Sequence, residues 1–82
     1  MMEFEGAPVT IEAPRVGAPV YYRLYLRMDR GLCKVSRVTP EHEDSELFRM
    51  GKGFVSPGRL SPGDALRLDP QGNPGEYWVR FE

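Results

Sequence analysis

Cysteine is nearly absent from this sequence, since Cys33 is the only one among 82 residues. A single thiol excludes an internal disulfide framework and a zinc site built from several cysteines. A reducing, cytoplasmic location is the default for such a composition. At this length folding buries only about 60% of the surface of the unfolded chain, so we expect modest stability unless a partner adds to it.

Long apolar runs and an excess of positive charge are also missing. No run approaches the roughly 20 residues that span a bilayer, and the acidic stretch MMEFEGAPV does not resemble a secretory signal. The formal net charge is −1, so no general positive field draws the protein to nucleic acid or to an anionic membrane. Binding to nucleic acid would therefore need a local basic patch.

Turn-forming residues are plentiful, with eight Pro and nine Gly, and they favour many turns over long helices. Two Ser-Pro-Gly copies, at 56–58 and 61–63, predict tight turns. Alternation of apolar and polar residues predicts strands near residues 9–13, 20–28, 32–38, 65–69 and 76–81.

The tripeptide Asp29-Arg30-Gly31 predicts a hairpin between the strands at 20–28 and 32–38, with a positive φ at Gly31. The sequence leaves the register of this hairpin open. In one register Cys33 and Val35 lie on the same face as Tyr25 and Arg27, which makes that face partly apolar and suited to being covered. In the other register they pair with the aliphatic face.

One helix is predicted over residues 40–50. Thr39 and Pro40 have the order of an N-cap and a first helical residue, and Glu41 adds negative charge to the first turn. Phe48 belongs to an apolar end, and Gly51 can terminate the helix. A polar loop is the alternative for this segment.

These segments together predict a single small, mainly β domain over residues 1–82. We expect a barrel-like or strongly bent antiparallel sheet of about five short strands with one short helix. A sandwich is disfavoured because it usually needs about 100 residues.

Residues that carry chemistry are few. His42 is the only histidine, and the carboxylates around it fit no calcium-loop spacing, which favours a solvated acidic segment. Cys33 would need a neighbouring base to act as a nucleophile, and its place in a predicted strand favours a small buried residue. The stretch 51–53, Gly-Lys-Gly, lacks the spacing of a phosphate-binding loop. We therefore expect no enzymatic activity, no metal and no cofactor.

The stretch VYYRLYLRM, residues 20–28, places aliphatic and aromatic side chains on one face of an extended strand and tyrosine with arginine on the other. The last predicted strand repeats this pattern, because its polar face carries tryptophan and arginine. The candidate partner-binding residues are Tyr21, Arg23, Tyr25, Arg27, Trp78 and Arg80.

Three interpretations of this face remain open. The arginines could lie across the tyrosine rings and pair with outward carboxylates at Glu12, Asp69 or Glu76, which would be purely structural. Tyr, Trp and Arg are also enriched at the hot spots of protein interfaces. Aromatic and cationic groups together can stack unpaired bases and hold phosphates.

The net negative charge favours protein over nucleic acid. The sequence therefore predicts an accessory, non-enzymatic interaction module that binds a macromolecular partner, either another protein or a second copy of itself. The alternative is a small single-stranded nucleic-acid-binding β-barrel of the OB or Sm-like kind. No membrane and no small-molecule substrate is expected.

Overall fold

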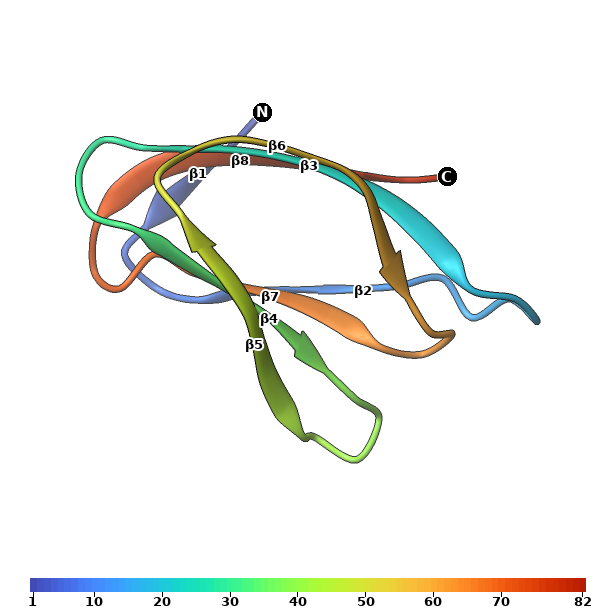
Figure 1. The fold of residues 1–82 in the computed structure, drawn as a ribbon. Coiled ribbons are helices and arrows are strands. Elements are labelled where there is room, and N and C mark those ends of the chain that lie inside the picture. The colour runs from blue at the N-terminus through green and yellow to red at the C-terminus, as the bar shows by residue number, and fades with distance from the viewer.

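Eight antiparallel strands in two four-stranded sheets form the computed structural model, which describes all 82 residues (Figure 1). The sheet that we call sheet A has the strand order β1-β8-β3-β6, and sheet B has the order β2-β7-β4-β5. The two sheets lie one above the other (Figure 1). The strands are β1 (Met2–Glu5), β2 (Val9–Glu12), β3 (Val20–Met28), β4 (Cys33–Val38), β5 (Asp44–Met50), β6 (Lys52–Leu60), β7 (Ala65–Asp69) and β8 (Pro74–Phe81).

The chain changes sheet at every connection except the one between β4 and β5. The resulting order, 1-8-3-6 facing 2-7-4-5, is that of a double-sheet jelly roll. The prediction of a mainly β antiparallel fold is confirmed. The barrel-like sheet, the count of about five strands and the short helix are wrong, because two separate sheets face each other and do not close into a barrel. Strands of only 4 to 9 residues allow 82 residues to build both layers.

The segment predicted as a helix contains β5 instead. Phe48 on β5 lies opposite Val35 on β4 and packs against the core. Thr39 Oγ1 accepts a hydrogen bond over 3.1 Å from the N–H of Glu43, four residues on, whereas an N-cap would accept one from two or three residues on. This bond closes the β4–β5 turn, in which His42 has a φ of 66°. Pairing with β4 therefore overrides the local helix signals.

The connection at residues 29–31 joins the two sheets and is not a hairpin. β3 pairs with β6 and β8, whereas β4 pairs with β5 and β7. Gly31 has the predicted positive φ, at 70°. Because β4 belongs to the opposite sheet, Cys33 and Val35 face the core and leave the outer face of β3 uncovered.

The two Ser-Pro-Gly copies have different structures. The second is the predicted turn, in which Gly63 has a φ of 85° and the Asp64 N–H donates to the Ser61 carbonyl over 3.1 Å. The first lies inside β6, beside the register shift between β6 and β3, so the predicted turn is wrong there. β6 is an edge strand, where Pro57 removes an N–H that no neighbouring strand needs.

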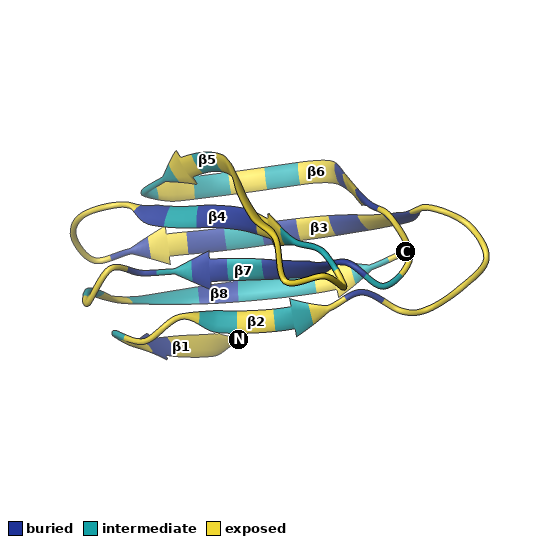
Figure 2. Ribbon diagram, turned by 90° about the horizontal axis from the view of Figure 1, so that it is seen from below, coloured by how far each residue is buried: buried dark blue, intermediate teal, exposed yellow.

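The core lies between the inner faces of the two sheets. Along β3, every second side chain from Val20 to Met28 is buried, as the alternation predicts (Figure 2). The structure contains no helix that is long and apolar enough to cross a membrane. The buried cluster comprises Phe4, Ala13, Tyr22, Leu24, Leu26, Met28, Cys33, Val35, Leu60, Leu66, Leu68 and Tyr77.

Gly58 is expected to be essential for this packing, because the ring of Tyr22 lies against its Cα. A Cβ added at Gly58 would overlap the ring atoms of Tyr22. We therefore predict that Gly58→Ala lowers the free energy of unfolding by about 2 kcal/mol, the cost typical of overpacking. Gly17→Ala is the matched control, because an added Cβ there meets no atom within 4 Å. Urea unfolding of both variants tests this, and equal midpoints would contradict it.

Candidate interaction surface

All six predicted partner-binding residues lie on the outer face of sheet A. β3 and β8 are neighbours, and their register places Tyr25 opposite Trp78 and Arg23 opposite Arg80. Tyr21 is 45% exposed, and the side chain of Arg23 is 50% exposed. The alternation in the sequence identified the outward residues of β3 and of β8 separately. The pairing of these two strands brings both groups of residues together.

Phe54, which sequence reasoning missed, completes an aromatic row across three strands. It lies on β6 opposite Tyr25, with ring centroids 4.9 Å apart, and Trp78 is opposite Tyr25 on the other side. Phe54 is 70% exposed, the most of these three. We call Tyr25, Phe54 and Trp78 the aromatic row. The only sequence signal for Phe54 was its place in a short apolar pair after the supposed helix.

The aromatic row borders a shallow apolar hollow of about 350 Å³. Met1 is the fourth residue that lines it, and 70% of Met1 is exposed. All four lining residues are hydrophobic. A contiguous exposed apolar area of this kind differs from the scattered apolar residues found on most protein surfaces.

Three arginines lie at one end of the row, and we call Arg23, Arg59 and Arg80 the arginine end. Arg80 lies directly opposite Arg23, and Arg59 lies opposite Tyr21. Arg23 pairs with Glu82 over 3.0 Å, whereas Arg59 and Arg80 form no ion pair. Like charges placed opposite each other are unfavourable in a sheet, so this end favours an approaching negative charge.

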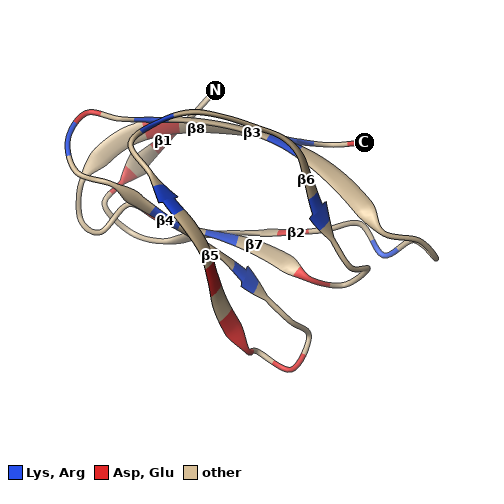
Figure 3. Ribbon diagram, in the orientation of Figure 1, with Lys and Arg blue, Asp and Glu red and all other residues tan.

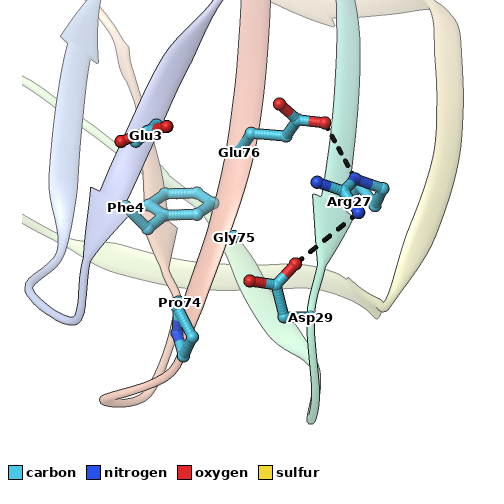
Figure 4. A pocket seen from close by; sticks show the side chains of 7 residues that line it. All are labelled: Glu3, Phe4, Arg27, Asp29, Pro74, Gly75 and Glu76. Carbon is cyan, nitrogen blue, oxygen red and sulfur yellow. Dashed lines mark hydrogen bonds and ion pairs between the residues drawn. The ribbon is translucent and has the colours of Figure 1, made fainter.

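Carboxylates gather at the other end of the row, and we call Glu3, Asp29 and Glu76 the acidic end. Arg27 bridges two of them, with Nε 2.8 Å from Glu76 and a terminal nitrogen 3.6 Å from Asp29 (Figure 4). The hydrogen bond to Glu76 raises the pKa of Arg27. Glu3 on β1 lies opposite Glu76 on β8. These two residues line one polar hollow together with Arg27 and Asp29. Arg27 therefore pairs with carboxylates on its own face, as the purely structural interpretation predicts, whereas Arg59 and Arg80 have no such partner.

The outer face of sheet B differs in character. Two ion pairs lie on it, between Arg67 and Asp44 at 3.4 Å and between Arg49 and Glu46 at 2.9 Å, whereas Lys34 and Arg37 on β4 form none. Its strands contain one exposed large apolar side chain, Leu47, at 44%. Basic residues occur on strands of both sheets, and acidic residues lie along β5 (Figure 3). Sheet B therefore offers a natural control face on the same molecule.

The residues considered for catalysis lie apart from this surface. Cys33 is fully buried, and burial, together with the charge of Asp69, raises the pKa of its thiol to about 11. His42 lies in the β4–β5 turn, beside a hollow that Glu12 and Arg15 also line, and its ring forms no hydrogen bond within the chain. No group of three His, Cys, Asp or Glu side chains is placed to hold a metal ion.

Comparison with models of known families, with curated proteins and with solved structures finds no match. The jelly-roll strand order does not select a function either, since one fold hosts many functions. The chemistry of the outer face of sheet A is therefore the ground on which a function can be proposed.

Because of Cys33, we expect the stability of the fold to depend on pH in the alkaline range. Burial raises its pKa from the ordinary 9.0 to about 11, so the folded state holds the proton more tightly than the unfolded state does. The free energy of unfolding should therefore fall as the pH rises from 9 to 11. Burial raises the pKa of Tyr22 as well, which acts in the same direction at higher pH.

Urea unfolding at a series of pH values measures this dependence. We expect Cys33→Ala to unfold more easily at neutral pH, because it leaves a cavity, but to lose less stability between pH 9 and 11. Parallel pH profiles for the two proteins would contradict the assignment.

Proposed function

We propose that this protein is a non-enzymatic interaction module that binds a protein partner through the outer face of sheet A. The observation that carries the proposal is the exposed ring of Phe54 on a paired sheet, beside the partly exposed rings of Tyr25 and Trp78. Phe54 is 70% exposed although no turn or chain end forces it outward. Covering one such side chain is worth about 1.5–3 kcal/mol, which a partner would gain.

The composition of the face matches that of protein interfaces. Tyr, Trp and Arg dominate interface hot spots, and the row supplies the first two beside the arginine end. Aromatic side chains have few rotatable bonds, so fixing them on binding costs little conformational entropy. Charged residues at both ends would form the polar rim of the interface.

Single-stranded nucleic acid is the second candidate, and the arginine end is the observation that favours it. Arg59 and Arg80 form no ion pair and lie beside rings that could stack on bases. The acidic end lies on the same face, however, and would repel the continuing phosphate chain. We therefore rank a protein partner first.

Removal of the most exposed ring tests the proposal. Phe54→Ala should leave the melting temperature nearly unchanged, because the side chain is mostly exposed, and should weaken capture of partners from extract of the native cell. Truncating an interface anchor commonly costs about 2 kcal/mol or more, which is over tenfold in affinity. Leu47→Ala, on the control face, should leave capture unchanged. Equal capture by all three proteins would contradict the proposal.

Fluorescence anisotropy with a labelled single-stranded oligonucleotide separates the two candidates. The nucleic-acid candidate predicts binding that depends on Arg80 and weakens steeply as the salt concentration rises. A protein partner held by aromatic packing should respond weakly to salt.

A further inference from the structure

We infer that the partner of this face is a second copy of the same chain, packed face to face about a two-fold axis that runs along the aromatic row. This inference rests on the proposed function, since it names the protein that covers the outer face of sheet A. Two observations carry it. The row crosses the strands at the middle of the face, and three arginines lie on one side of it, whereas the other side carries three carboxylates together with Arg27 and Lys52.

The symmetry follows from the strand register. Consider a two-fold axis that lies in the interface plane and runs along the row. It places each strand of sheet A opposite the same strand of the second copy, and the two run in opposite directions. Tyr25, Phe54 and Trp78 then meet the same residues of the second copy. Residues on one side of the row meet residues on the other side.

The charges select this orientation. On β8, Arg80 and Glu76 stand two residues to either side of Trp78, so Arg80 of each copy faces Glu76 of the other. The pair occurs twice by symmetry. On β3, Arg23 faces Arg27, whose charge Glu76 and Asp29 already offset.

An axis parallel to the strands is the competing orientation. It would place the arginine end of one copy over the arginine end of the other, where Glu82 is the only paired carboxylate. Like charges brought together in this way cost several kcal/mol at an interface. The polarity of the face therefore favours the axis along the row.

Edge-to-edge pairing of sheets is disfavoured as the mode of association. Sheet A has two free edges: β6 carries Pro57 and a register shift, and β1 is only four residues long and carries Glu3 and Glu5. All of these features hinder the addition of a strand. Sheet B also has two free edges: β5 begins with acidic residues that would repel a second copy, and β2 is only four residues long and ends in Glu12.

The area of the face allows a weak dimer. Strands spaced about 4.8 Å apart with a rise of about 3.3 Å per residue give a four-stranded face of roughly 500 Å² per copy. Burying it on both copies gives about 1,000 Å², near the lower limit for specific interfaces. We therefore expect a dimer that forms at high concentration and dissociates on dilution.

Sedimentation velocity of the purified protein over a wide concentration range tests the inference. The wild type should pass from monomer to dimer as the concentration rises. Arg80→Glu alone and Glu76→Arg alone should each weaken the dimer at least tenfold, because each places like charges face to face. An equimolar mixture of the two variants should dimerise again, since each chain then offers the charge that the other lacks.

Arg37→Glu, at an exposed position on β4 of sheet B, is the matched control and should leave the dimer intact. Phe54→Ser provides a second test that leaves every charge in place, and it should also give a monomer. Circular dichroism of each variant confirms that it is folded, because exposed ion pairs such as that of Arg27 and Glu76 contribute little to the stability of a fold.

A wild type that stays monomeric at every concentration would overturn the inference, as would a mixture that fails to dimerise. If the wild type stays monomeric but still captures a different protein through Phe54, the proposed function holds and the inferred dimer is wrong. A monomer whose captured proteins do not depend on Phe54 would remove both.

Discussion

The burial of Leu24 and Leu26 between the two sheets is the constraint on which the rest of the structure depends. Both side chains are fully buried on β3, which lies between β8 and β6 in sheet A. Because side chains alternate along a strand, their burial commits the residues between them to the outer face. Strand pairing then sets Trp78 and Phe54 beside Tyr25 on that face. The aromatic row is therefore a consequence of how the core is packed.

The alternation along β3 and the positive φ at two glycine turns could be predicted because short-range rules decide them. Alternation alone identified the buried and exposed faces, and glycine chemistry located the positive φ at Gly31 and Gly63. Pairing partners could not be predicted, because they depend on contacts between residues far apart in the sequence. Thr39 illustrates the limit: its side chain, predicted to cap a helix, closes a turn between two strands instead. Phe54 was missed because its place in the aromatic row depends on the pairing of β6 with β3, which sets it beside Tyr25.

The two outer faces show how one small sandwich can keep one surface solvated and leave another available. Sheet B exposes one large apolar side chain, Leu47, whereas sheet A carries the exposed ring of Phe54 beside the partly exposed rings of Tyr25 and Trp78. Such a face would cost the monomer little stability but would gain from being covered. This agrees with the expectation that a chain of this length is only modestly stable alone. Association and stability would then increase together.

Trp78 provides the most direct measurement of the central claim, that the aromatic row is covered when the protein assembles. It is the only tryptophan, so its fluorescence reports on the row alone. Quenching by acrylamide should weaken as the protein concentration rises in the wild type, and should not change with concentration in Phe54→Ser. Quenching of the wild type that stays equally strong at every concentration, and in the presence of proteins that co-purify with it, would contradict the account.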